Sequence, residues 1–80
     1  MKLVVAVVKE EQAGRALDAL VASEYRATRM NTAGGFLKKG NSTLLVGVED
    51  EQVDEVLGIV KGKAPSTTAF VLNVVQHVRL

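Results

Sequence analysis

The sequence has 80 residues, a formal net charge of +1 and 48% apolar residues, so it accommodates one small domain, residues 1–80, without a broad basic face for general nucleic-acid binding. The absence of cysteine excludes disulfides and thiolate metal sites, and a single histidine gives no reason to expect a metal centre. No targeting segment is visible and the first apolar run is too short to cross a membrane, so a cytoplasmic location is expected.

The first half of the chain predicts a strand, a helix and a second strand. Leu3–Val8 is a continuous, mostly β-branched apolar run, which is typical of a central strand buried on both faces. Lys9–Glu24 has helical spacing, with Glu10 and Glu11 at the positive end of the helix dipole. Arg26–Thr32 is a weaker strand that mixes polar and apolar residues. The expected apolar stripe of the helix comprises Ala13, Ala16, Leu17, Leu20 and Val21.

The second half repeats this order. Thr43–Val48 predicts a strand, and Glu49 begins a second helix with Gly62 as its C-terminal cap. Gly62–Thr67 contains the only proline and reads as a short loop, after which Thr68–Val78 forms the last strand. The resulting order β-α-β-β-α-β indicates an α+β, ferredoxin-like fold, in which both helices cover one face of an antiparallel sheet. The stripe of the second helix comprises Val53, Val56, Leu57 and Val60.

The predicted topology leaves one face of the sheet without helices. Because Leu3–Val8 is apolar on both sides, that second face needs a cover, and the simplest cover is another copy of the same chain. The sequence therefore predicts a homo-oligomer.

The segment 26–47 carries most of the information about function. It contains a basic, glycine-rich loop with one aromatic residue, Phe36, and it holds four basic residues and no acidic ones between 26 and 41. Glycine lets a ligand approach the backbone, while N–H groups and cationic side chains meet an anion, so the loop suits a phosphate joined to a flat base. The alternative is a solvated hairpin turn. The basic residues are Arg26, Arg29, Lys38 and Lys39.

Several short motifs together resemble the PII-like cyclic di-AMP receptor proteins. They are Lys-Leu-x-x-Ala-x-Val at 2–8, Arg26-Ala27-Thr28, Gly34-Gly35-Phe36-Leu37, Gly40-Asn41-x-Thr43, Val46-Gly47-Val48 and Val53-Asp54-Glu55-Val56-Leu57. The resemblance runs from Met1 to Val60 and resumes at Ala69–Leu72. It implies a ferredoxin-like subunit, a homotrimer with inward-facing sheets, no catalytic activity, and a dinucleotide bound between subunits that signals to a partner protein.

The same resemblance assigns expected roles to individual residues. Arg26 and Thr28 are expected to contact phosphate or base, and Asn41 to hydrogen-bond a base edge. Gly47 is expected to let ligand or backbone come close, and Phe70 to line the cleft. Backbone contacts and an apolar surface for one adenine are expected from Gly35, Phe36 and Leu37.

Two departures from the family pattern are visible. The loop before the last strand, Gly62–Thr67, is short where relatives usually have a long one, and Arg79 stands where the family's tail normally has a glutamine. Two other functions therefore stay open. One is a ligand-free, trimeric protein-interaction module that uses the loop Gly34–Asn41, and the other is an RNA-binding domain of the same topology, which the lack of aromatic residues in the first and third strands disfavours.

No catalytic constellation is visible, so no enzymatic activity is expected. The serines lack a pattern of activating bases, and the acidic residues gather at helix starts, where they cap the helix and complement its dipole. His77 stands alone and reads as a surface or interface residue.

Overall fold

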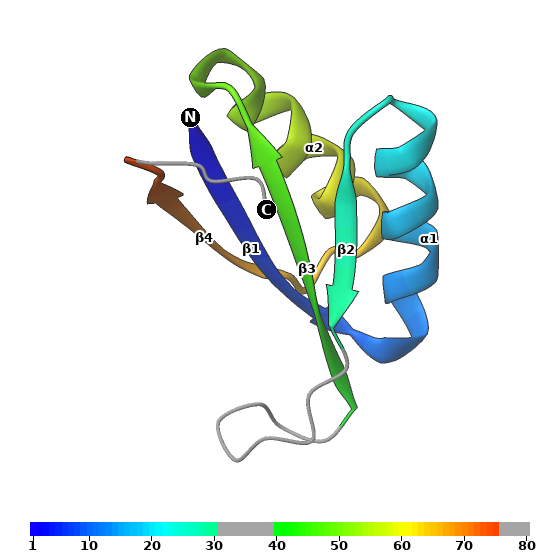
Figure 1. Ribbon diagram of the computed structural model, residues 1–80. Helices are drawn as coiled ribbons and strands as arrows, with labels where there is room; N and C mark the ends of the chain where they lie inside the picture. The colour runs from blue at the N-terminus through cyan, green and yellow to red at the C-terminus, as the bar shows by residue number, and fades with distance from the viewer. Residues whose placement is uncertain (31–39, 76–80) are drawn as a thin grey trace.

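The computed structural model describes residues 1–30 and 40–75 and shows a four-stranded antiparallel sheet backed by helices (Figure 1). The sheet order is β2-β3-β1-β4, so β1 and β3 are central and β4 forms one edge. The elements are β1 (Lys2–Lys9), α1 (Glu10–Ala22), β2 (Ala27–Met30), β3 (Asn41–Val48), the 3-10 turn η1 (Asp50–Gln52), α2 (Val53–Lys63) and β4 (Thr68–Asn73).

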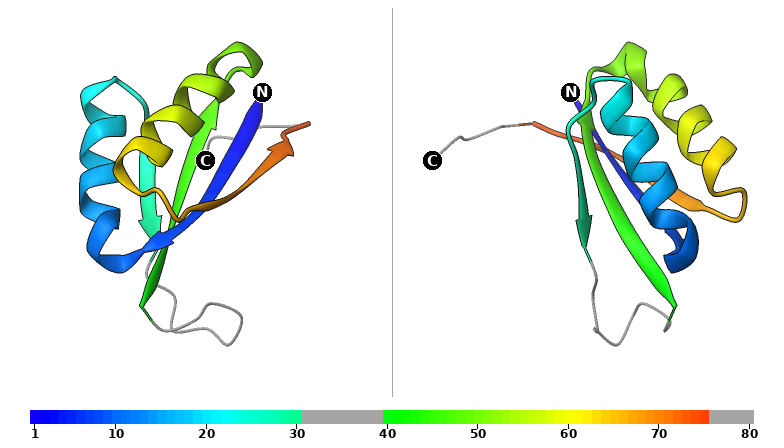
Figure 2. Two further views of the ribbon diagram at one scale, coloured as in Figure 1. Left: turned by 180° about the vertical axis from the view of Figure 1, so that it is seen from behind. Right: turned by 90° about the vertical axis from the view of Figure 1, so that its right-hand side faces the viewer.

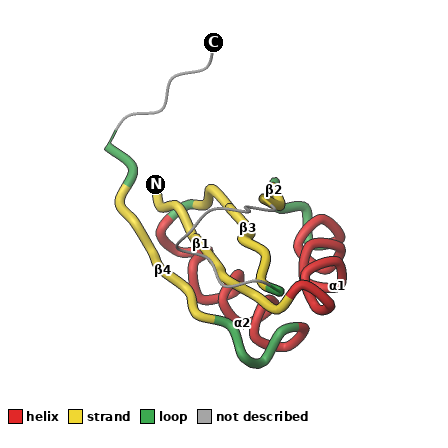
Figure 3. The backbone as a smooth tube through the Cα atoms, turned by 90° about the horizontal axis from the view of Figure 1, so that it is seen from below, coloured by secondary structure: helices red, strands yellow, loops and turns green. Residues whose placement is uncertain are grey.

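Both helices lie on the same side of the sheet, and the other side carries no helix (Figures 2 and 3). This arrangement confirms the ferredoxin-like βαββαβ fold that the order of apolar runs predicts. We call the side without helices the open face.

The core lies between the sheet and the helices. Alternate residues of the central strands are buried there, because successive side chains of a strand point to opposite faces. The helices contribute small or branched residues at helical spacing, which lets the two layers approach closely. The buried apolar residues are Val4, Ala6, Val8, Ala13, Ala16, Leu20, Leu44, Val46, Val48, Val56, Val60 and Ala64.

The helices α1 and α2 end in different ways. Glu24 adopts a left-handed conformation, φ 68°, and the Tyr25 N–H donates to the Leu20 carbonyl at 3.0 Å, which reverses the chain after α1. The prediction that Gly62 caps α2 is wrong, since the helix runs to Lys63 and the capping residue is Ala64. Ala64, which directly follows the last residue of the helix, is buried in the core.

Three other sequence predictions need correction. Val21 is 57% exposed rather than part of the buried stripe of α1, because the 3.6-residue turn of the helix places it to one side of the row formed by Ala13, Ala16 and Leu20. Within the described residues the last strand runs from Thr68 to Asn73, and residues 76–78 of the predicted strand lie outside them. The third strand begins earlier than predicted, at Asn41, because β1 continues to Lys9 and pairs with it there.

Candidate functional site

The register of the sheet places three of the expected ligand residues on the open face. Residues directly opposite one another in antiparallel strands share a face, and Val5 lies opposite Leu45 on one side and Phe70 on the other. Thr28 in turn lies opposite Leu45, so one row crosses the sheet from β2 to β4. Because the neighbouring Val4 is buried under the helices, this row faces away from them.

A second row brings Gly47 onto the same face. Gly47 lies opposite Leu3, which lies opposite Leu72 on β4. Leu72 is 50% exposed and Phe70 is 54% exposed, so the open face carries large apolar side chains in contact with solvent in the single chain. Such a face is expected to be covered by a ligand or by another protein surface.

Arg26 and Gly47 meet at one end of the open face, in a pocket of about 380 Å³. Arg26 is the first residue of the predicted strand Arg26–Thr32, but it precedes the observed β2 by one residue. The pocket combines the guanidinium group with an apolar wall, an arrangement that fits an anionic group attached to a flat or apolar one. The remaining lining residues are Met1, Lys2, Leu3 and Val74.

Among residues 1–30 and 40–75, little fills the space above Gly47. A Cβ atom built on Gly47 has one neighbour within 4 Å among these residues, the Met1 Cε at 3.8 Å, which is an ordinary van der Waals contact. Gly47 is also exposed. The packing of the described residues therefore does not require a glycine at position 47.

Asn41 lies at the other end of β3 from Gly47. It pairs with Lys9, and the preceding Gly40 has a positive φ of 93° that suits glycine. Since a strand rises about 3.4 Å per residue, the two positions are separated by roughly 20 Å. The structure thus brings Arg26 and Gly47 together and leaves Asn41 apart from them.

Two further outcomes concern the basic, glycine-rich segment. Gly35, Phe36 and Leu37 lie outside the described residues. Arg29 does not share the open face, because its Nη2 atom donates a 3.3 Å hydrogen bond to the Ser42 Oγ on the helix side of the sheet. Successive side chains of a strand point to opposite faces, so the neighbouring position of Thr28 on the open face indicates that Arg29 lies on the helix side.

Sequence reasoning missed the apolar wall of the pocket. The sequence patterns place Leu3 and Val74 in strands and Met1 at the start of the family resemblance, without a role in binding for any of them. Met1 and Val74 are brought together by the pairing of β1 with β4, in which the Val74 N–H donates to the Met1 carbonyl at 3.0 Å.

Two further features of the described residues concern metal binding and membrane insertion. Within residues 1–30 and 40–75, no group of three His, Cys, Asp or Glu side chains is arranged to hold a metal ion. In the same residues, no helix combines the length and apolar character needed to cross a bilayer.

Comparisons with known proteins agree with this architecture. Residues 1–79 match the family model described as cyclic-di-AMP receptor. A curated relative, the nitrogen fixation nifHD region GlnB-like protein 1 of Methanothermococcus thermolithotrophicus, is 34% identical and aligns with 80% of this chain and 73% of its own length. A solved structure, that of a functionally unknown protein from Pediococcus pentosaceus, superposes with a TM-score of 0.85 at 35% identity and covers 99% of this chain and 96% of that one.

Proposed function

Because this chain belongs to the cyclic-di-AMP receptor family, whose members are non-enzymatic signalling proteins, we propose that it binds cyclic di-AMP between the subunits of a homotrimer. In this proposal the bound nucleotide changes how the trimer engages a partner protein in the cytoplasm. The expected contacts are Arg26, Thr28, Gly35, Phe36, Leu37, Asn41, Gly47 and Phe70.

The observation that carries the proposal is the pocket shared by Arg26 and Gly47. A guanidinium group can bind a phosphate through two parallel hydrogen bonds, and the apolar wall beside it suits the face of a base. The space left by Gly47 lets a ligand reach the backbone of β3.

The separation of the expected contacts supports a site made by more than one copy. Arg26 and Gly47 lie at one end of the sheet and Asn41 at the other, so a ligand that contacts both ends fits best where copies meet. The apolar open face, with Phe70 and Leu72 about half exposed, supplies the surface through which copies would associate. Burying it stabilises the assembly by roughly 25 cal/mol for each Å² of apolar area removed from water.

Isothermal titration calorimetry with cyclic di-AMP, cyclic di-GMP, ATP, ADP and AMP tests the proposal. We expect cyclic di-AMP to bind most tightly and to raise the melting temperature, since a ligand of the native state stabilises it. Arg26→Ala should weaken binding by about 1.5–3 kcal/mol through loss of a charge-assisted hydrogen bond.

The matched control is Arg15→Ala, which removes the same charge from the exposed side of α1 and should bind as the unaltered protein does. No binding of any of these nucleotides would refute the proposal and favour the ligand-free interaction module. Equal binding by Arg26→Ala and Arg15→Ala would show that the site lies elsewhere.

A further inference from the structure

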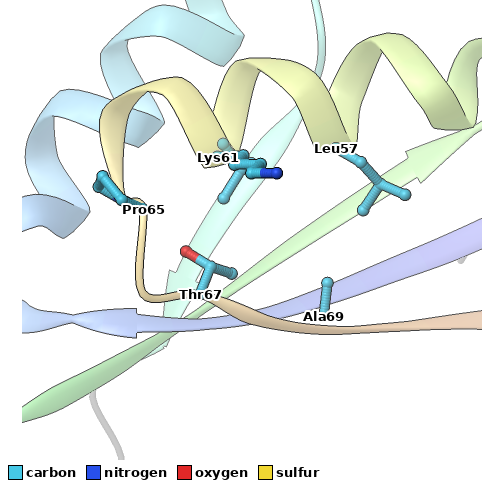
Figure 4. A pocket seen from close by; sticks show the side chains of 6 residues that line it. Leu57, Lys61, Pro65, Thr67 and Ala69 are labelled. Carbon is cyan, nitrogen blue, oxygen red and sulfur yellow. The ribbon is translucent and has the colours of Figure 1, made fainter.

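A second pocket lies on the opposite side of the sheet, between α2 and the start of β4. It has a volume of about 280 Å³, and its apolar lining comes from Leu57, Val60 and Ala69. Pro65 closes one end, and Leu57 and Lys61 project from α2 above Thr67 and Ala69 (Figure 4). The pocket exists because the helix layer is narrower than the sheet, so Val71, which shares the helix side with Ala69, is still 42% exposed.

Lys61 is the one cationic group of this pocket. Among the residues that the structure describes, no carboxylate lies within ion-pair distance of it. The Thr67 hydroxyl donates to the Ala64 carbonyl, so its proton is already used within the turn. The pocket therefore combines an apolar lining with a positive charge that no described carboxylate compensates, and it is complementary to an apolar group with a carboxylate nearby.

The outer edge of β4 borders this pocket. β4 is the last strand in the sheet order, and all six of its residues are exposed. The Val74 N–H points to β1, where it donates to the Met1 carbonyl. Because backbone directions alternate along an antiparallel strand, the N–H and C=O groups of Ala69, Val71 and Asn73 point away from β1 and out of the sheet.

An apolar edge strand of this kind is a template for another strand. It carries no charge, proline or bulge that would prevent pairing. A strand added to such an edge gains main-chain hydrogen bonds, and its alternate side chains can enter a neighbouring pocket.

We infer that the β4 edge and the adjoining pocket bind an extended segment of a partner protein in which an apolar residue is followed, two positions on, by an acidic one. The apolar side chain enters the pocket lined by Leu57 and Val60, and the carboxylate pairs with Lys61. Main-chain hydrogen bonds form to Ala69 and Val71. This inference does not rest on nucleotide binding.

The charges of the chain's own edges favour such a partner over a second copy. β4 has no charged residue, and β2, at the other edge of the sheet, contains Arg29 and no acid. Neither strand contains the carboxylate that Lys61 lacks, so pairing with either edge strand of a second copy brings it no acidic strand residue.

Selection from a phage-displayed random heptapeptide library against the full chain, without nucleotide, tests the inference. We expect the selected peptides to alternate apolar and polar residues, with Asp or Glu two positions from an apolar residue. Against Lys61→Glu, the acidic preference should change to Lys or Arg, because the charge at position 61 is reversed.

Val71→Pro tests the strand pairing separately. Proline removes an N–H that points away from β1, so β4 should stay paired within the sheet while binding of a selected peptide weakens about tenfold or more. Val71→Thr is the matched control, which keeps the N–H and should bind within about threefold of the unaltered protein. Circular dichroism establishes that each variant is folded.

Three outcomes would overturn the inference. One is that no peptide is enriched, and another is that the selected peptides show no acidic preference that reverses with Lys61→Glu. The third is that sedimentation velocity shows Val71→Pro to change the oligomeric state, which would identify a second copy as the occupant of the edge.

Discussion

Gly47 on β3 lies directly opposite Leu3 on β1, and both line the pocket that contains Arg26. A side chain at position 47 is therefore compatible with the fold, but it would occupy the space proposed for the ligand. Stability and binding can be separated there.

Gly47→Val should leave the melting temperature unchanged or raise it, because a β-branched residue suits a strand and the described residues leave room for a side chain there. The same change should weaken cyclic di-AMP binding, measured by calorimetry, since the side chain fills the space proposed for the ligand. Gly58→Ala on α2 is the control, as its Cβ also meets nothing within 4 Å but lies away from the site. A Gly47→Val protein that binds normally would remove Gly47 from the proposed site.

Val5→Asp should prevent assembly of copies through the open face. Val5 stands in the middle of the row between Leu45 and Phe70, where a charge buried at an interface is costly. Light scattering should report a trimer for the unaltered protein and a monomer for the variant. Val21→Asp, on the exposed side of α1, should remain a trimer. A monomeric unaltered protein at micromolar concentration would contradict the prediction.

The pKa of Tyr25 is raised above 10.0 by burial, and further by a hydrogen bond from its hydroxyl to the Glu55 carboxylate and by that charge. Since the folded state favours the neutral phenol, this contribution to the free energy of unfolding is full below the unfolded pKa. It is lost as the pH rises through the folded pKa. Denaturant unfolding should show the loss above about pH 10.

Because Tyr25 is the only tyrosine, tyrosinate absorbance reports its titration directly. Glu55→Gln should lower the midpoint while leaving it above that of the unfolded chain, as burial is the largest cause. A midpoint equal to the unfolded value in this variant would show that Glu55, and not burial, dominates.

Glu24→Gly should stabilise the protein by about 0.5–1 kcal/mol. The left-handed conformation costs a residue with a Cβ about 1–2 kcal/mol, and the greater freedom of glycine in the unfolded chain offsets part of the gain. Urea unfolding monitored by circular dichroism measures the difference. Ser23→Gly, at φ −90°, has no such strain to relieve and should not stabilise. Equal effects of the two changes would refute the explanation.

The amino-acid sequence by itself determined the order of elements and the faces of the central strands. The apolar run of β1 and the helical spacing of Ala13, Ala16 and Leu20 are local patterns, and a local pattern is enough to place a residue on a strand or helix. For the same reason the topology followed from the order of strands and helices alone.

Only the tertiary structure decided where elements end and which distant residues meet. Val21 continues the apolar spacing of α1 but is exposed. Gly62 is of a residue type that often caps helices but lies within a helix that ends at Lys63. The pocket lined by Arg26 and Gly47 depends on the register of the strands. The pocket beside Lys61 depends on the width of the helix layer relative to the sheet. Register and layer width arise from contacts between residues far apart in the chain, which no local pattern records.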